Sequence, residues 1–254
     1  QYTLDDWVPL FTSLGYRIWE HACFLWENHG YKTFEDFLAC FSKNQRRNIR
    51  REEQKLAERG ITLSVRAGEE IPSEWSALMY SFYYGTNVKF GPWSCLYLTP
   101  AFFEGVFLRF RHRLVMVAAH DRRTPDPVGM AMFLRKGQRL WGRYWGSHAY
   151  IPHLHFNVCY YTPIRWAIAQ GIRYFDPGIG SEHKARRGFV SRRGYSLHHF
   201  FDPRLQALFD DNIGRFNQLI REQIDDQNLA MPLHSARPEN HGGHHACFRE
   251  VRKP

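Results

Sequence analysis

The sequence lacks several features that would assign it to a class at once. No apolar run approaches the roughly 20 residues that a membrane-spanning helix needs. No signal-peptide pattern stands at the start, although residue 1 is Gln and not an initiator Met. No segment repeats, and no GxxxxGK[ST] motif is present, which excludes a P-loop nucleotide site. What is left is a globular chain of 254 residues, long enough for one large or two small domains.

Cysteine is scarce and irregularly placed. The five cysteines are odd in number, widely spaced and without a CxxC pair: Cys23, Cys40, Cys95, Cys159 and Cys247. A disulfide framework or a thiolate zinc site would need closer or paired spacing. The pattern therefore predicts reduced thiols in a cytoplasmic protein.

Acidic residues are too few to balance the basic ones. Lys and Arg number 34 against 25 Asp and Glu, a formal net charge of +9. One interpretation is solubility alone. The other is a polyanionic partner such as RNA, a nucleotide or the phosphates of coenzyme A. Composition does not choose between them, so the positions of the charges matter.

Hydrophobic periodicity predicts an α+β fold. Helices are predicted over 33–41, 45–59, 73–87, 99–112, 153–171 and 204–230, and strands over 61–68, 113–121, 127–137, 139–147, 172–178 and 195–202. Pro163 lies inside one helix and predicts a kink or a split there. Three meandering strands followed by a helix and a strand have the topology of the GNAT acyltransferase superfamily. We therefore expect a GNAT-like mixed, largely antiparallel central sheet flanked by helices.

The first candidate site is a basic run on the second predicted helix. Arg46 and Arg50, like Arg47 and Arg51, are four residues apart, so their charges gather on one side of the helix. Adjacent cations repel one another unless an anion or carboxylates are near. These four arginines are candidates for binding phosphate or RNA. The alternative is a solvated helix face that is partly paired with acids.

The second candidate lies in "LWGRYWGSHAYIPHLHFNVCYY", where the last meander strand ends. Six residues are candidates for lining a substrate pocket: Arg143, Tyr144, Trp145, His155, Asn157 and Tyr160. A His-x-His pair at 153 and 155 could bind zinc, but zinc wants four well-placed ligands and no thiol pair helps. We therefore predict no metal.

The third candidate is the loop "DPGIGSEHKARRGF", residues 176–189, which follows a predicted strand. Glu182, His183 and Lys184 supply an acid, a base and a cation in consecutive positions. Arg186 and Arg187 add bidentate phosphate-binding capacity. The glycines let backbone N–H groups approach an anion. The alternative is a solvated surface turn.

A phosphate cradle is missing at one place. Acetyl-CoA-dependent GNAT enzymes hold the pyrophosphate with a [QR]-x-x-G-x-[GA] segment after the last meander strand. Here that position reads "GSHAYIPHLHF", which lacks the second glycine step and contains Pro152. This difference argues against ordinary acyl-CoA chemistry.

Several segments together resemble a known family. They are "FEDFLACFSKNQRRNIRREEQKLAERGI", "LYLTPAFF", "LWGRYWG", "LHFNVCYYTPIRWAIAQGI" and "PGIGSEHKARRGF". In this order they resemble the bacterial GNAT-like group of peptidoglycan biosynthesis/recognition proteins, relatives of the Fem aminoacyltransferases. The resemblance runs from about residue 20 to about residue 205.

The resemblance implies a reaction and a domain plan. Fem enzymes have tandem GNAT-like units and transfer an amino acid from aminoacyl-tRNA to an amine, without a metal or a covalent intermediate. Their lysine before a Phe/Gly pair implies an oxyanion-stabilising role for Lys184, although here Gly precedes Phe. We interpret residues 1–32 as the remnant or end of a preceding GNAT-like unit, 33–60 as a basic helical segment, 61–228 as the GNAT-like acyltransferase domain and 229–254 as a loose His-rich tail.

The function expected from the sequence is therefore acyl transfer that forms an amide. The donor is an activated ester, aminoacyl-tRNA before acyl-CoA, and no other cofactor is expected. The acceptor is an amine on a small molecule or a cell-wall precursor, and tRNA is a candidate partner. Two alternatives stay open at this point: acyl-CoA-dependent N-acyl transfer, and a non-catalytic module that binds cell-wall precursors or RNA.

Overall fold

The structure, a computed structural model, describes residues 7–178, 180 and 182–233. Most of the predicted His-rich tail and the first six residues lie outside this part of the chain. The chain divides into two compact units. The larger unit contains residues 26–178 and 233, and the smaller unit contains 7–25, 180 and 182–232.

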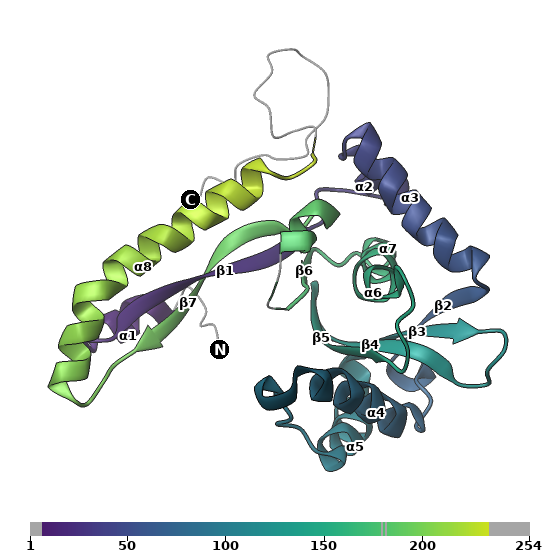
Figure 1. Cartoon of the computed structure of the whole chain (residues 1–254), viewed down its shortest axis with the longest axis horizontal. Coiled ribbons are helices and arrows are strands. Elements are labelled where there is room, and N and C mark those ends of the chain that lie inside the picture. The colour runs from purple at the N-terminus through teal and green to yellow at the C-terminus, as the bar shows by residue number, and fades with distance from the viewer. Residues whose placement is uncertain (1–6, 179, 181, 234–254) are drawn as a thin grey trace. The chain divides into compact units, whose positions relative to one another are not determined.

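A mixed sheet forms the centre of the larger unit (Figure 1). Its strands are β2 (Ile61–Ala67), β3 (Leu114–Asp121), β4 (Pro127–Lys136), β5 (Arg139–Ser147) and β6 (Tyr174–Asp176). They pair in this order, antiparallel except for the parallel β5–β6 pair. The last two residues of β1 (Arg17–Glu27) pair antiparallel with β6. The predicted largely antiparallel sheet is confirmed.

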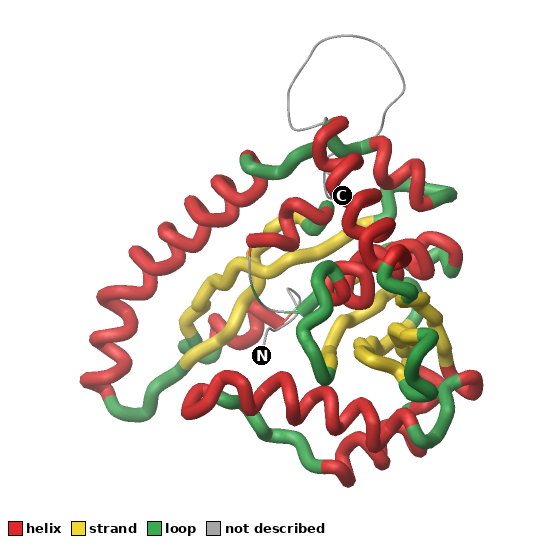
Figure 2. The backbone as a smooth tube through the Cα atoms, turned by 45° about the vertical axis from the view of Figure 1, so that its right-hand side comes forward, coloured by secondary structure: helices red, strands yellow, loops and turns green. Residues whose placement is uncertain are grey.

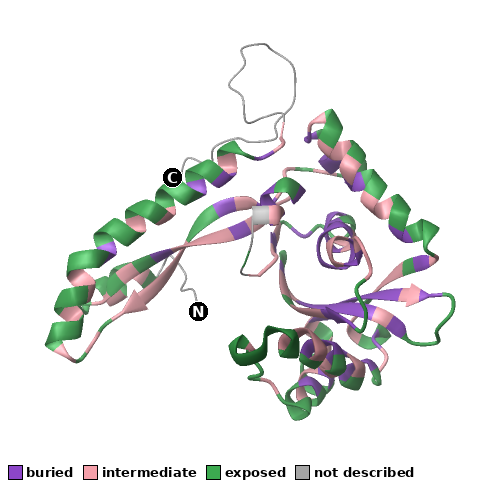
Figure 3. Cartoon of the chain, viewed as in Figure 1, coloured by how far each residue is buried: buried purple, intermediate pink, exposed green. Residues whose placement is uncertain are grey.

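Helices cover both faces of this sheet. α4 (Trp75–Asn87) packs on β4 and β5 and against α5 (Pro100–Arg109). The opposite face carries α6 (Leu154–Phe156), the π-helix η5 (Asn157–Tyr161) and α7 (Thr162–Ala169) (Figure 1). The remaining helices of this unit are α2 (Phe34–Ala39), α3 (Lys43–Glu58) and the 3₁₀ turns η2 (Gly68–Glu70), η3 (Val88–Trp93) and η4 (Arg111–Arg113). Because both faces are covered, β3 and β4 are mostly buried (Figure 3).

Local sequence signals explain where these helices begin and end. The Thr33 hydroxyl accepts from the Asp36 N–H, and the Asp36 carboxylate accepts from the Thr33 N–H, so α2 begins with a complete capping box. Gly60 follows α3 with φ of 79°, as a helix C-terminus favours. Pro163 is the second residue of α7, and the π-helix Asn157–Tyr161 occupies the turn before it, where proline removes a helical hydrogen bond and crowds the preceding carbonyls. The predicted split is therefore found at the place where proline disturbs a helix.

Alternating strand residues build the core on the α4 side of the sheet. Met116, Ala118 and Met130 face Phe82 and Phe103 in one cluster of buried side chains. Each buried phenylalanine contributes about 1.5–3 kcal/mol relative to an exposed one. This cluster holds α4 and α5 against the strands that carry the candidate pocket.

The smaller unit contains a two-stranded ribbon and a long helix. Residues 17–25 of β1 pair antiparallel with β7 (Val190–His198), and α8 (Pro203–Leu229) runs beside β7 (Figure 2). A short helix α1 (Val8–Ser13) precedes β1, and the 3₁₀ turn η6 (Glu182–Arg187) precedes β7. The buried carboxylate of Glu20 accepts two hydrogen bonds, of 2.6 and 2.9 Å, from the Arg221 guanidinium, which fixes α8 on β1.

Two strand predictions need correction in this unit. Residues 17–27 form a strand that periodicity did not predict, because its aromatic side chains alternate only loosely with polar ones. The strand predicted over 195–202 spans Val190–His198, because pairing with β1 fixes it and not its own apolar residues.

The described residues also show the state of four cysteines, the character of the helices and the grouping of possible metal ligands. Cys23, Cys95 and Cys159 are thiols, in agreement with the prediction, whereas Cys40 is disulfide-bonded and departs from it. Within the described residues, no helix is both long enough and apolar enough to cross a bilayer. The same residues contain no group of three or more potential metal ligands of the His, Cys, Asp and Glu type.

Candidate functional site

The two strands expected to frame the pocket separate early. Parallel pairing between β5 and β6 covers only Arg139 with Tyr174, Leu140 with Phe175 and Trp141 with Asp176. In the described part of the chain, β5 has no partner on this side beyond Trp141, so its later backbone groups stay available for a ligand. A β-strand that diverges from its neighbour in a sheet creates an opening of this kind.

A β-bulge re-aims the strand at the same place. Phe133 pairs with Gly142 and Met132 with Tyr144, so Arg143 is the extra residue on β5. Its side chain is exposed. The bulge also sets which side chains of β5 face each layer of helices.

The predicted pocket residues divide between the two faces of β5. Tyr144 packs edge-on against Tyr83, with ring centroids 5.2 Å apart, so it belongs to the α4 side. Burial there raises the pKa of the Tyr144 hydroxyl. Trp145 lies 4.4 Å from the His155 ring, which in turn lies 5.2 Å from Tyr160. The structure therefore brings Trp145, His155 and Tyr160 together and places Tyr144 on the opposite face.

Asn157 holds the helix after β5 against α3. Its Nδ2 donates to the carbonyls of His153, at 3.0 Å, and Glu52, at 3.3 Å. The Tyr161 hydroxyl donates to the Glu52 carboxylate, and Arg165 pairs with Glu53 at 2.7 Å. Asn157 is 2% exposed, so it acts as a brace between two helices and not as an open pocket wall.

The basic helix α3 uses part of its charge internally. Arg46 donates at 3.3 Å to the carbonyl of Ala39, the last residue of α2, and at 2.7 Å to the carbonyl of Phe41, just beyond it. Arg50 pairs with Glu35 at 2.5 Å. Arg51 donates to the Asn48 side chain at 3.0 Å and is exposed. Arg47 is exposed and makes no hydrogen bond or ion pair with the described residues.

In the smaller unit, the loop that follows β6 contains the buried cation Lys184. This side chain is 3% exposed, and its Nζ lies 5.9 Å from the centroid of the Phe24 ring. Gly180 has φ of +121°, where a side chain is strained, and a Cβ there would lie 3.9 Å from Lys184 Nζ. A buried ammonium beside flexible glycine backbone is a suitable donor for a developing anion.

Burial and charge also act on the neighbouring histidine. Burial, together with the cations of Arg187 and Lys184, lowers the pKa of His183 to about 4. His183 is therefore a neutral imidazole at neutral pH. Arg187 is 6% exposed and donates to the His183 carbonyl at 2.9 Å, which braces η6, whereas Arg186 is exposed. The side chain of Glu182 lies outside the described residues.

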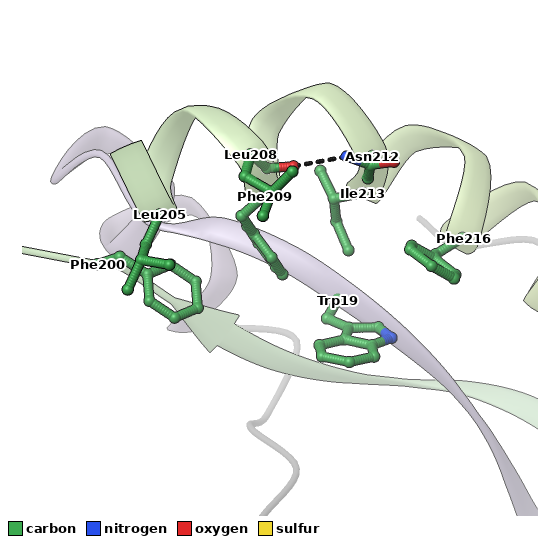
Figure 4. Close-up of a pocket in the computed structure, with 8 residues that line it drawn as sticks. All are labelled: Trp19, Phe200, Leu205, Leu208, Phe209, Asn212, Ile213 and Phe216. Atoms are coloured by element: carbon green, nitrogen blue, oxygen red, sulfur yellow. Dashed lines mark hydrogen bonds between the residues drawn. The ribbon is translucent and has the colours of Figure 1, made fainter. Parts of the chain in front are cut away.

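A cavity of the smaller unit is almost wholly apolar. A groove of about 390 Å³ is lined by Trp19, Phe200, Leu205, Leu208, Phe209, Asn212, Ile213 and Phe216 (Figure 4). The amide of Asn212, its one polar lining side chain, donates to the Leu208 carbonyl at 2.8 Å. No side chain there is placed to orient a reacting group, so we do not assign the groove to catalysis.

Comparison with protein families decides the assignment. The profile of the FemAB-like family, described as "Peptidogalycan biosysnthesis/recognition", matches residues 1–235. The chain belongs to this family. It is therefore an acyltransferase of the aminoacyl-transferring, amide-forming kind. A comparison with curated proteins gives no match.

Solved structures place the FemAB-like chain within a known fold. It is similar to L-PGS from Bacillus licheniformis (13% identity, TM-score 0.58, 83% of this chain and 71% of that one). It is similar to the C-terminal domain of a putative lysylphosphatidylglycerol synthetase from Agrobacterium fabrum (10% identity, TM-score 0.59, 84% of this chain and 70% of that one). It is also similar to FemX (11% identity, TM-score 0.50, 82% of this chain and 71% of that one). At these identities the likeness shows the fold alone, a mixed and largely antiparallel sheet flanked by helices, as predicted.

Several features of the FemAB-like site were not predicted from the sequence. The bulge at Arg143 could have been sought at Gly142, since glycine inside a strand often marks a bulge. The π-helix has only Pro163 as a signal. The contact between Tyr161 and Glu52 joins residues more than 100 positions apart, and no local pattern announces it.

Proposed function

We propose that this FemAB-like chain transfers an aminoacyl group from aminoacyl-tRNA to an amine, on a small molecule or a cell-wall precursor. The neighbours named for lysylphosphatidylglycerol synthesis and FemX support aminoacyl transfer to cell-envelope acceptors. We further propose that the reaction takes place in the cytoplasm and needs no cofactor besides the two substrates.

The buried Lys184 is the single observation that carries the proposal. Lysine is among the residue types least often fully buried, so a lysine with 3% exposure is a candidate for a functional role. Lys184 stands at the position that the Fem resemblance links to oxyanion stabilisation, beside the glycine backbone of Gly180. A fixed cation in a site of low dielectric stabilises a developing negative charge far more than one in water.

The proposed step is attack of the neutral amine on the ester carbonyl carbon. A C–N bond forms, and the carbonyl oxygen becomes an oxyanion that Lys184 stabilises. The C–O bond of the ester then breaks, and the ribose hydroxyl leaves. The amine loses one proton in the step, and the leaving oxygen gains one, so no net proton is released.

His183 is suited to pass that proton on at once and not to hold it as a stable imidazolium. A pKa of about 4 keeps the imidazole neutral and able to accept, but two neighbouring cations disfavour the imidazolium. A proton taken from the amine would therefore pass on quickly to the leaving oxygen. Glu182 remains a candidate for the same role.

The candidate phosphate-binding arginines fall into two groups. Arg46, Arg50 and Arg187 already bond within the protein. Arg47, Arg51 and Arg186 are exposed, Arg51 with a hydrogen bond to the Asn48 side chain, and their exposure makes them the better candidates for contacting tRNA phosphates. Within the larger unit, Arg143, Trp145 and His155 are the candidates for contacting the acceptor, and Tyr160, which is 3% exposed, packs against the His155 ring and supports it.

The test is incubation of the full chain with charged tRNA and candidate amines, with mass spectrometry to detect new amides. We expect transfer by the wild type and a loss of about a hundredfold or more in Lys184→Met, which keeps the buried stem and removes the charge. Lys136→Met, at the exposed end of β4, is the matched control and should transfer at the wild-type rate. Thermal melting of each variant establishes that it folds.

Two results would contradict the proposal. Transfer from acetyl-CoA but not from charged tRNA would assign the donor to the acyl-CoA class instead. Equal rates for folded Lys184→Met and the wild type would remove Lys184 from the oxyanion role.

A further inference from the structure

A polar cavity of the larger unit has no role in the site described above. It measures about 340 Å³ and is lined by Lys55, Glu58, Arg59, Pro152 and His153. The first three residues stand at the C-terminal end of α3, and the other two stand in the turn between β5 and α6. The cavity therefore lies where the sequence lacks the glycine cradle of acetyl-CoA-dependent enzymes.

Positive charge dominates this cavity. Lys55 and Arg59 are four residues apart on α3, so they lie on the same side of the helix. Within the described part of the chain, neither side chain makes a hydrogen bond or an ion pair. Glu58 supplies one carboxylate, which accepts from Gln54 at 2.7 Å. Two cations against one carboxylate leave an excess that an anion would relieve.

His153 occupies this cavity at the cost of backbone strain. Its φ is 68°, the one positive φ of a non-glycine residue among those described. A side chain in this region clashes with its own backbone, and glycine would avoid the clash. Strained residues cluster at ligand sites. The sequence keeps an imidazole here, at the wall of a cationic cavity, where glycine would be the easier choice.

The two walls of the cavity are fixed to each other. The His153 carbonyl accepts from the Asn157 N–H at 3.3 Å and from Asn157 Nδ2 at 3.0 Å. The same Nδ2 reaches the Glu52 carbonyl of α3 at 3.3 Å. Since Glu52 and Glu53 are bonded to Tyr161 and Arg165, their carboxylates are engaged away from Lys55. A site held in this way loses little entropy when it binds.

We propose that Lys55, Arg59 and His153 form a binding site for phosphate oxyanions. Guanidinium and ammonium groups are the usual donors to phosphate, and the imidazole adds a third donor from the opposite wall. The identity of the molecule that carries the phosphate rests on the proposed function, according to which it is the donor substrate. Side chains here would do what backbone amides do in a glycine cradle.

The binding test uses inorganic pyrophosphate and calorimetry at low salt. Lys55→Ala and Arg59→Ala should each weaken pyrophosphate binding by about threefold to tenfold, in the range of partly exposed charge-assisted contacts. Lys43→Ala removes the same charge from the other end of α3, about 18 Å away along the helix axis, and should leave binding unchanged. Glu58→Gln removes the one carboxylate and should strengthen binding.

His153→Gly separates the role of the ring from the fold. It relieves the positive φ, so the melting temperature should stay the same or rise, while pyrophosphate binding weakens. Unchanged binding in Lys55→Ala, Arg59→Ala and His153→Gly would overturn the proposal. An effect of Lys43→Ala equal to that of Lys55→Ala would also overturn it, since the attraction would then be non-specific.

Two further arms identify the carrier of the phosphate. If the phosphate belongs to tRNA, Lys55→Ala/Arg59→Ala weakens the binding of uncharged tRNA and coenzyme A does not bind. If it belongs to a coenzyme A diphosphate, coenzyme A binds the wild type and the same variant loses it. Pyrophosphate binding without any transfer activity would keep the anion site and reject the proposed function.

Discussion

Replacing Gly146 with Ala tests the contact between α4 and β5 most directly. A Cβ at this position would lie 2.6 Å from Thr86 Oγ1 and under 3.0 Å from the Phe82 carbonyl oxygen. The second atom is helix backbone and cannot rotate away. Either α4 or β5 must therefore shift, and overpacking of this kind typically costs about 1–3 kcal/mol of unfolding free energy.

Two other glycines provide controls, one with little expected effect and one with an effect of opposite sign. A Cβ at Gly142, on the same strand, would lie 3.5 Å from Pro177 atoms, an ordinary contact, so its effect should stay within about 0.5 kcal/mol. Gly85 lies inside α4 with no atom within 4 Å of a new Cβ. There, alanine should stabilise the protein by about 0.5–1 kcal/mol, since glycine is a poor helix former.

The measurement is chemical denaturation of the wild type and the three alanine variants. We expect the unfolding free energy to be highest for Gly85→Ala, lower and about equal for the wild type and Gly142→Ala, and lowest for Gly146→Ala. A Gly146→Ala variant as stable as the wild type would refute the close approach of α4 to β5. A matching loss in Gly142→Ala would show instead that β5 tolerates no side chain at either glycine.

Three more predictions follow from single contacts. Because the folded pKa of His183 is about 4, below its ordinary value of 6.5, the unfolded chain binds more protons between these values. The unfolding free energy should therefore fall as the pH drops from about 6.5 to about 4, and His183→Gln should reduce this dependence on pH. An NMR titration should find the His183 ring neutral at pH 6. Thr33→Ala should lower the unfolding free energy, measured in denaturant, by about 0.5–2 kcal/mol through loss of the α2 cap. Thr62→Ala, at an exposed position of β2, should lower it less. Tyr161→Phe should cost about 1–3 kcal/mol because the hydroxyl no longer donates to the Glu52 carboxylate, and a double-mutant cycle with Glu52→Gln should show coupling.

The parts of the fold that the sequence predicts well are those with local causes. The Thr33 cap, the Gly60 stop and the three meander strands each depend on residues within a few positions of one another. The meander also fixes its own pairing, because short turns leave adjacent strands little choice. The GNAT-like order of elements could therefore be derived before any contact was known.

The parts that escaped prediction depend on distant partners. β1 and β7 pair across more than 160 residues, so neither strand carries enough local signal to be placed. The bulge at Arg143 has a different reason, because its partners on β4 are close in sequence but Gly142 is its one local signal. The positive φ of His153 arises from the turn that joins β5 to α6, and composition gives no hint of it.

Charge density alone did not show which cations of α3 are already bonded to other described residues. Its arginine run is the most conspicuous basic feature of the sequence, yet Arg46 and Arg50 bond to α2 or to the loop after it. Lys55 and Arg59 sit in a less basic stretch and remain open at a cavity. An alanine scan of α3 should therefore separate into two classes. Changes at Arg46 should lower stability because two carbonyls lose a donor, and changes at Lys55 and Arg59 should lower anion affinity while stability is kept.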